Sequence, residues 1–492
     1  MNNTVTLPPS KKQITVLKTQ SGLIFRKSDI SSKLVSQIKN QLTLKRELSR
    51  GGGKTASKVV YMYKEFSNRL VIPKHACIDS LLTQFNLKLF CKDNTPAGKP
   101  IQPECEITPM NTAQQKILEQ LTSSCILKAP TGSGKTYMGC MYLCKHARKT
   151  LIVVPSENAL REWKIAIQLI KNVKVGYYYG KKKQDGDIVI GIVNSLTRNC
   201  FDKNMVNWFN QFGTVIYDEI HTYTSPKYSQ IFWVTGFANC LGVTATPDED
   251  RWDLDIIYKL HLGEIIEMQK SDDSVYWKGY VQPIFYEGNP KYCKHVITDS
   301  SLDYGATVKQ LSEDPYRNQM IAGLIKQLLS RGRNIFVFFL HRYMAESIIK
   351  CLGKDQFKQQ QDSYVLMGGS TEACIDQASK QASLILTTFG YGFQSLSMKQ
   401  MDTLVITSPR TAKTKQIVGR ILRESGNTEI PRLICDVVDI KLSLGFKHYN
   451  SRKKVYTDKS DFDFKINKGV RKRWSDKNLQ IFDQMINWRL LD

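Results

Sequence analysis

The sequence predicts an α/β protein with two parallel-sheet domains in tandem, preceded by a small basic N-terminal domain. Short apolar runs alternate with helix-like stretches after residue 106, as is typical of buried parallel strands joined by helices. A glycine-rich loop follows one of these runs. The 492 residues are enough for about three domains of ordinary size, each with its own core.

The N-terminal domain is expected over residues 1–105, where 18 lysines and arginines stand against 6 acidic residues. Apolar stretches at 59–63 and 70–72 favour a folded domain there. Residues 451–492 form a basic C-terminal extension, and the whole chain carries a net charge of +25. Such a balance indicates a polyanionic partner, DNA or RNA, and salt-dependent binding. The alternative is a basic surface that is only solvated.

The glycine-rich loop lies between an apolar run at 125–127 and a helix-like stretch. It reads Ala129, Pro130, Thr131, Gly132, Ser133, Gly134, Lys135, Thr136. Backbone N–H groups of such a loop and the following helix N-terminus bind phosphate, Lys135 would reach the terminal phosphates, and Thr136 would bind Mg²⁺. The loop therefore predicts a site for ATP and Mg²⁺. A plain flexible turn is the alternative that this complete motif disfavours.

Two acidic residues end the apolar run 215–217. Hydrolysis of a terminal phosphate needs one carboxylate to hold Mg²⁺ and another to orient or deprotonate the attacking water. Asp218 fits the first role and Glu219 the second. An acidic pair at any strand exit is the alternative, but the phosphate loop upstream favours the catalytic interpretation.

Arginines near the C-terminus predict a third part of the site. If residues 416–423 are helical, Gln416, Arg420 and Arg423 share one face. Arginines brought from elsewhere in a fold stabilise the charge on a phosphoryl group during transfer. The alternative is an amphipathic helix with solvated arginines.

The domain boundaries follow from these motifs. A first domain is expected over 106–265, with strands at 150–154, 188–193, 214–217 and 240–243, followed by a connecting segment over 266–315. A second domain over 316–450 would contain a helix at 320–329 and strands at 335–340, 383–386 and 403–407, without a phosphate loop. ATP is expected between the two domains, so that binding and hydrolysis would close and open them.

These motifs resemble, in order and spacing, those of superfamily-two helicases over about residues 106–440. The resemblance implies two RecA-like motor domains and ATP hydrolysis by Lys135, Asp218, Glu219, Arg420 and Arg423. By the same resemblance, Gln114 or its neighbour Gln115 would read adenine. Residues that would couple the nucleotide to the nucleic acid are His221, Thr244, Ala245, Thr246 and Gln416. Those that would contact the nucleic-acid backbone are Pro155, Ser156, Asn194, Ser195, Thr387 and Thr388.

The order Asp-Glu-x-His and the segment 407–411 are most similar to helicases of large cytoplasmic DNA viruses related to the poxvirus transcript-release helicase. That likeness implies transcript displacement with the viral transcription machinery, in the host cytoplasm or packaged in the virion. The sequence departs from the family at Ser395 and Ser397, where glycine and aspartate are usual, so coupling between nucleotide and nucleic acid is expected to differ.

Three functions stay open from the sequence. The first is a helicase or translocase on DNA or RNA–DNA hybrids, and the second is an RNA helicase that remodels viral messages. The third is a non-catalytic nucleic-acid-binding scaffold, which the intact motifs disfavour. No run reaches the roughly 20 apolar residues of a membrane span, and residues 1–12 lack a signal peptide, so a soluble, unsecreted protein with reduced thiols is expected.

Overall fold

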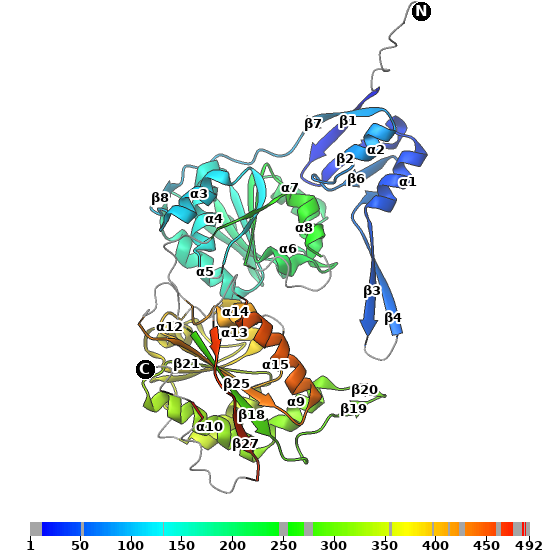
Figure 1. Cartoon of the computed structure of the whole chain (residues 1–492). Coiled ribbons are helices and arrows are strands. Elements are labelled where there is room, and N and C mark those ends of the chain that lie inside the picture. Colours follow the sequence, from blue (N-terminus) through cyan, green and yellow to red (C-terminus); the bar gives the residue numbers. More distant parts are fainter. Residues whose placement is uncertain are drawn as a thin grey trace, which may run out of the picture. The chain divides into compact units, whose positions relative to one another are not determined.

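The computed structural model describes residues 12–50, 54–130, 132–245, 254–269, 279–353, 357–395, 398–411, 414–422, 429–458, 464–475, 485–486 and 488. The chain divides into two compact units, Met1–Ser271 and Asp272–Asp492 (Figure 1). Each unit contains a largely parallel eight-stranded sheet with helices packed against it. The predicted α/β class is confirmed.

The first unit begins with a five-stranded sheet in the order β5-β6-β2-β1-β7. Its strands are β1 (Lys12–Thr19), β2 (Gly22–Arg26), β5 (Lys64–Glu65), β6 (Arg69–Ile72) and β7 (Leu87–Asp93), with helices α1 (Ser32–Gln41) and α2 (Asp79–Gln84). Between α1 and β5, the strands β3 (Thr43–Arg50) and β4 (Lys54–Tyr61) pair as an antiparallel hairpin outside this sheet (Figure 1).

The main sheet of the first unit has the order β13-β12-β14-β10-β15-β16-β9-β17 and is parallel except for the pair β12–β13. Its strands are β9 (Ser124–Lys128), β10 (Thr150–Val154), β12 (Val175–Tyr179), β13 (Lys182–Gln184), β14 (Ile188–Ile192), β15 (Thr214–Asp218), β16 (Asn239–Thr244) and β17 (Ile265–Glu267). Its helices are α3 (Thr112–Gln120), α4 (Lys135–His146), α5 (Glu157–Ile167), α6 (Val193–Leu196), α7 (Lys203–Phe209) and α8 (Asp255–Leu262), and β8 (Glu104–Cys105) pairs separately with β11 (Ile170–Lys171).

The five-stranded sheet and the main sheet share one hydrophobic core. Buried side chains of the N-terminal part, such as Phe25 and Leu34, belong to the same cluster as Val215 and Phe232 of the main domain. Burial of apolar surface is the dominant favourable term in folding. The N-terminal part is therefore packed into the first unit.

The second unit has a sheet in the order β22-β23-β21-β24-β25-β18-β26, with β27 also paired to β18. Its strands are β18 (Gly279–Glu287), β21 (Ile335–Phe339), β22 (Ser363–Leu366), β23 (Leu384–Thr388), β24 (Thr403–Ile406), β25 (Arg432–Asp439), β26 (Phe464–Ile466) and β27 (Val470–Arg473). Its helices are α9 (Tyr304–Ser312), α10 (Pro315–Ser330), α11 (Arg342–Leu352), α12 (Glu372–Gln381), α13 (Phe389–Ser395), α14 (Thr414–Val418) and α15 (Ser443–Tyr456).

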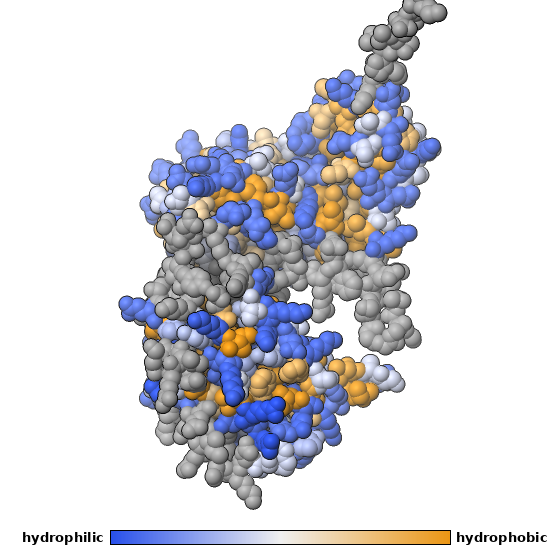
Figure 2. Space-filling model, in the orientation of Figure 1, coloured by the Kyte–Doolittle hydropathy of each residue, from blue (hydrophilic) through white to orange (hydrophobic). Residues whose placement is uncertain are grey.

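A short hairpin of β19 (Ile297–Thr298) and β20 (Ser301–Leu302) lies outside that sheet. Figure 2 shows apolar side chains at this hairpin, where Ile297 and Leu302 are 60% and 42% exposed. None of the described helices has the length and apolar content that a membrane crossing requires. The twelve cysteines are all free thiols.

Two predicted segments contain strands of the second sheet. The segment 266–315 includes β18, which pairs with β25 along eight positions, and the C-terminal segment 451–492 includes β26 and β27. Pro283 lies in the middle of β18 and has no N–H to donate to a neighbouring strand. A proline at such a place in a sequence argues against predicting a central strand there. The sheet accommodates it because β26 pairs with 279–281 and β27 with 284–287.

Candidate nucleotide site

The candidate site lies where three neighbouring parallel strands of the first unit end. In the sheet, β16 lies between β15 and β9, with Asp218 opposite Val243 and Thr244 opposite Lys128. The backbone N–H of Ala129 donates to the carbonyl oxygen of Thr244 at 3.0 Å. The phosphate loop, the acidic pair and Thr244 are therefore brought together at one edge of the sheet, as expected for parallel sheets.

The phosphate loop has the backbone that its glycines allow. Gly132 and Gly134 have φ of 88° and 78°, in the left-handed region. Gly134 is the N-cap of α4, whose first residue is Lys135. The Lys135 ammonium donates to the carbonyl oxygens of Ala129 and Pro130 at 3.2 and 3.0 Å. A cation inside the loop and a helix N-terminus beside it both favour a phosphate ligand. Thr131 lies outside the described residues.

Gln114 supports this loop from α3. It is 1% exposed; its side-chain amide donates to the carbonyl oxygen of Ser133 at 2.9 Å and its oxygen accepts from the N–H of Met110 at 2.7 Å. A β-carbon at Gly134 would lie 2.7 Å from the Gln114 amide nitrogen. Gln114 thus fixes the loop, while Gln115 is exposed. The adenine-reading role stays a prediction.

The acidic pair is held by the strand end and by a buried tyrosine. The Tyr223 hydroxyl donates to the carbonyl oxygens of Asp218 at 2.7 Å and Val153 at 3.0 Å, which ties β15 to β10. Glu219 has φ of 48°, so the chain turns sharply there. The sequence did not reveal the role of Tyr223, since no pattern marks a tyrosine five residues downstream.

The electrostatics of the pair suit a divalent cation. Burial raises the pKa of Asp218, and the neighbouring carboxylates of Glu219 and Glu162 raise it further. A cation would offset this cost, and the Asp218 carboxylate with the Thr136 hydroxyl are the hard oxygen ligands that Mg²⁺ prefers. Within the described part of the chain, no cluster of three or more His, Cys, Asp or Glu could hold a metal. A Mg²⁺ ion here would complete its coordination with phosphate and water, as it does in nucleotide sites.

His221 connects the acidic pair to β16. It is 3% exposed, its Nδ1 lies 2.9 Å from the Thr244 hydroxyl, and the same atom lies 3.3 Å from a carboxylate oxygen of Glu219. The polar chain runs from Glu219 through His221 to Thr244, whose carbonyl accepts from the phosphate loop. Ala245 follows directly, and Thr246 lies outside the described residues.

The residues predicted to contact nucleic acid lie at strand ends and take part in local hydrogen bonds. Ser156, after Pro155, accepts from the N–H of Ala159 at 3.4 Å and caps α5. In α6, Asn194 accepts from the Lys227 ammonium, and Ser195 accepts from the N–H of Gly180 at 3.3 Å. In the second unit, Thr387 is buried and Thr388 accepts from the N–H of Tyr391 at 3.3 Å. Their nucleic-acid roles stay predictions.

The helix predicted over 416–423 is shorter than expected. Helix α14 ends at Val418, and the chain continues in tight turns in which Arg420 N donates to Ile417 O and Ile421 N to Val418 O. Gly419 has low helix propensity, and such i to i+3 bonds are typical where a helix ends. Gln416 and Arg420 are 6% and 8% exposed. Arg423 and Ser397 lie outside the described residues.

The loop, the acidic pair and the buried histidine lie together at the edge of a parallel sheet, in the arrangement expected of a P-loop ATPase site. Residues 103–249 match the family model described as "Type III restriction enzyme, res subunit". A protein of African swine fever virus named as an ATP-dependent RNA helicase, QP509L, is 28% identical over 406 residues, which cover 76% of this chain and 78% of that protein. The transcript termination protein of Myxoma virus is 24% identical over 401 residues, covering 76% and 80%.

The solved structures show the same fold. Yeast (S. cerevisiae) Dbp5 bound to RNA and ADP BeF3 aligns with a TM-score of 0.50 and 12% identity, covering 76% of this chain and 93% of that one. At this identity the likeness concerns the fold alone. It confirms the predicted RecA-like domains. The family match and the viral relatives confirm the predicted resemblance to superfamily-two helicases and the prediction of an ATP-hydrolysing enzyme.

Proposed function

We propose that this protein couples ATP hydrolysis to movement along DNA or RNA–DNA hybrids and displaces transcripts during viral transcription, in the host cytoplasm. The polar chain from Glu219 through the buried His221 to Thr244 carries this proposal, because it joins the hydrolytic carboxylate to a neighbouring strand end and to the phosphate loop. A transcript termination protein among the relatives supports the biological role.

In this mechanism the chain's own residues bind and orient the nucleotide. The loop N–H groups and Lys135 bind the phosphates, and Glu219 orients the attacking water and accepts its proton. Mg²⁺ held by Thr136 and Asp218 would neutralise phosphate charge. Arg420 and Arg423 are proposed to stabilise the transferring group, and Gln416 to couple that step to the nucleic acid.

A second candidate is an RNA helicase that remodels viral messages. It is favoured by the African swine fever virus relative, which is named as an RNA helicase. The two candidates differ in the polymer that stimulates hydrolysis, since proteins tell RNA from DNA through the 2′-hydroxyl.

The deciding experiment measures ATP hydrolysis at one fixed salt concentration without polymer and with single-stranded DNA, duplex DNA, RNA or an RNA–DNA hybrid. Stimulation chiefly by DNA or the hybrid supports transcript displacement. Stimulation chiefly by RNA favours message remodelling, and no hydrolysis under any condition contradicts both.

The substitution Glu219→Gln provides the matching test of the site. We expect it to bind ATP normally and to lower kcat by about 100-fold or more, because the amide cannot accept the water's proton. The control is Glu157→Gln, which changes an exposed carboxylate in the first turn of α5 and is expected to leave kcat unchanged. Unchanged turnover in Glu219→Gln would remove Glu219 from this role.

A further inference from the structure

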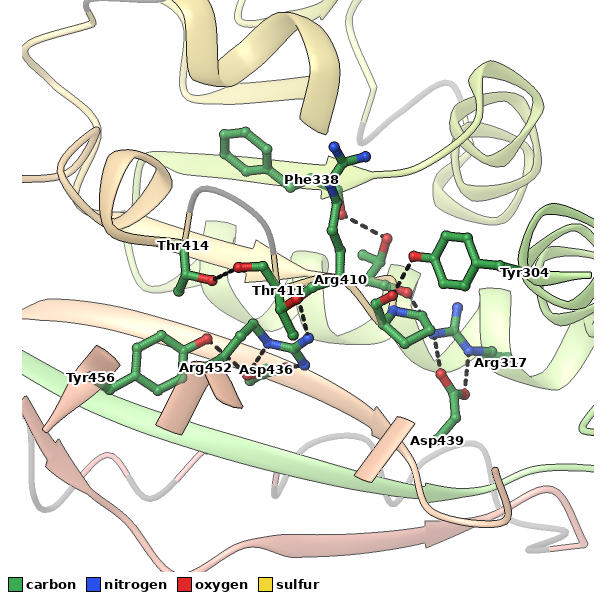
Figure 3. A network of polar contacts seen from close by, with 12 residues as sticks. Tyr304, Arg317, Phe338, Arg410, Thr411, Thr414, Asp436, Asp439, Arg452 and Tyr456 are labelled. Atoms are coloured by element: carbon green, nitrogen blue, oxygen red, sulfur yellow. Dashed lines mark hydrogen bonds and ion pairs between the residues drawn. The ribbon is translucent and has the colours of Figure 1, made fainter. Parts of the chain in front are cut away.

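The backbone of the segment 407–411, which follows β24 and precedes α14, is held by side chains at nearly every residue (Figure 3). Four of its carbonyl oxygens accept side-chain hydrogen bonds. These are Thr407 from the Arg317 guanidinium at 2.6 Å, Pro409 from the Tyr304 hydroxyl, Arg410 from the Arg452 guanidinium at 2.7 Å, and Thr411 from the Thr414 hydroxyl at 2.8 Å.

The two arginines that hold this segment are fixed to β25. Arg317 makes a two-pronged ion pair with Asp439 at 2.7 and 2.9 Å, and both side chains are 0% exposed. Arg452 pairs with Asp436 in the same way at 2.9 and 2.6 Å, and the Tyr456 hydroxyl donates to Asp436 at 2.8 Å. Since a guanidinium is planar, each arginine can bind its carboxylate and a carbonyl at a fixed geometry.

Stability alone does not account for these pairs. Burial would lower the pKa of Arg452, but Asp436 raises it overall, so the guanidinium stays charged. Buried ion pairs cost desolvation, and well-packed apolar side chains often stabilise a fold equally well. An apolar side chain cannot, however, bind the backbone carbonyls of Thr407 and Arg410.

We propose that Arg317 and Arg452 are positioning residues for ATP hydrolysis. They connect β25 rigidly to the segment 407–411 and so determine where Gln416 and Arg420, a few residues further along, are placed. The inference rests on the proposed function, because ATP hydrolysis is its readout.

A third buried arginine offers a matched control within the same sheet. Arg333 is 7% exposed and donates to Asp402 at 3.3 Å and to the carbonyl oxygen of Pro431 at 2.6 Å. Asp402 immediately precedes β24, so this pair lies at the amino-terminal end of the strand whose other end leads into the segment 407–411. Like the other two arginines it binds a carboxylate and a backbone carbonyl, here through one nitrogen, and the length of β24 separates it from the segment 407–411.

The experiment compares Arg317→Lys, Arg452→Lys and Arg333→Lys in the full chain, with saturating polymer. Lysine keeps the charge but cannot bind the carboxylate and the carbonyl as a fork. We expect kcat to fall about tenfold or more in Arg317→Lys and Arg452→Lys with KM for ATP unchanged, because positioning acts on the transition state. Arg333→Lys should also lose thermal stability but keep the wild-type kcat.

Wild-type kcat in Arg452→Lys, or an equal fall of kcat in Arg333→Lys, would overturn the inference. Should the arginine variants fail to fold, the kcat of Tyr304→Phe provides the test, because this substitution removes one donor to the carbonyl oxygen of Pro409 and should lower kcat. Its control is Tyr364→Phe, which removes a buried hydroxyl that donates to the carbonyl oxygen of Gln360 at 3.2 Å and should keep the wild-type kcat. A wild-type protein without polymer-stimulated hydrolysis would instead contradict the proposed function and leave the variants' stabilities unaffected.

Discussion

His221 lies between Glu219 and the end of β16 and contacts both. Its ring is buried and lies within hydrogen-bonding distance of Thr244, and its contact with Glu219 is only slightly longer. Buried polar networks of this kind are rigid when every member is satisfied and costly when one partner is missing. Loss of the Thr244 hydroxyl should therefore weaken the coupling of ATP hydrolysis to unwinding more than it slows the hydrolytic step itself.

We predict that Thr244→Val lowers the unwinding rate about tenfold or more while ATP hydrolysis stays within about threefold, because Lys135 and Glu219 remain in place. Unwinding of a labelled duplex and ATP hydrolysis are measured side by side. The control is Thr235→Val, which removes another fully buried hydroxyl that donates to Ile231 at 2.7 Å. Equal uncoupling by both substitutions would show that burial, and not the contact with His221, is responsible.

The lowered pKa of Lys64 predicts that the stability of the fold depends on pH. Its ammonium lies 3.6 Å from the ring centre of Phe201 and 5.1 Å from that of Trp233, and burial lowers its pKa to about 8 from the ordinary 10.5. The unfolded chain thus holds this proton between pH 8 and 10.5 while the folded chain releases it. Stability should therefore rise with pH across this window, and Lys64 opposes folding most strongly below pH 8.

We expect Lys64→Met to raise the Tm at pH 7 and the gain to shrink as the pH approaches 10.5. Thermal unfolding followed over this range checks it, with Lys88→Met, at an exposed lysine, as the control. A lower Tm of Lys64→Met at pH 7 would mean that the cation–π contacts of Lys64 outweigh the cost of its burial.

At the scale of elements, the β3–β4 hairpin is a candidate for nucleic-acid binding. Residues 45–58 contain five lysines and arginines and one glutamate. We predict that replacing residues 46–58 with a short Gly-Ser turn weakens polymer binding and reduces the salt slope by about 0.9 for each phosphate that the hairpin neutralises in the wild-type protein. Leu44 and Val60, which pack against the core, are kept.

Binding titrations at several salt concentrations provide the measurement for the hairpin. Replacing the β19–β20 hairpin in the same way serves as the control, because that hairpin carries exposed Ile297 and Leu302. If the salt dependence of polymer binding is unaltered, the β3–β4 hairpin does not contact nucleic acid and would instead bind a protein partner.

The sequence predicted those elements whose local pattern is unambiguous. Strand β10 coincides with the predicted 150–154, because all five residues are apolar or β-branched and fully buried. Strand β18 could not be recognised, since its pairing around Pro283 depends on two strands about 180 residues later. The phosphate loop and acidic pair were visible as motifs. The buried state of Arg317 and Arg452 was not, because no local pattern distinguishes a buried arginine from a solvated one.

At the scale of the whole molecule, the shared core makes the N-terminal sheet a structural part of the first unit. Phe25 and Leu34 belong to the core cluster of the main domain, so removal of residues 1–105 would expose it. A fragment that preserves this core must contain all of residues 1–271.

We predict that the fragment 1–271 binds ATP within about tenfold of the full chain but hydrolyses it about 1,000-fold more slowly, because it lacks Arg420 and Arg423. Titration with a fluorescent ATP analogue and single-turnover hydrolysis provide the two readouts, with Lys135→Ala in the same fragment as the control. Hydrolysis at the full rate would show that the arginines are dispensable.

The pairing of β18 has a consequence for the nascent chain. On one side this strand pairs with β25, and on the other with β26 and β27, which end at Arg473. After residues 279–287 have left the ribosome, nearly 200 more residues must be synthesised before β26 and β27 can cover that second side. Until then an apolar strand edge is open to other chains, which is the kind of exposure that leads to aggregation. Chaperone capture during translation, or slow elongation late in the message, would therefore affect the yield of this protein more than the strength of its finished core.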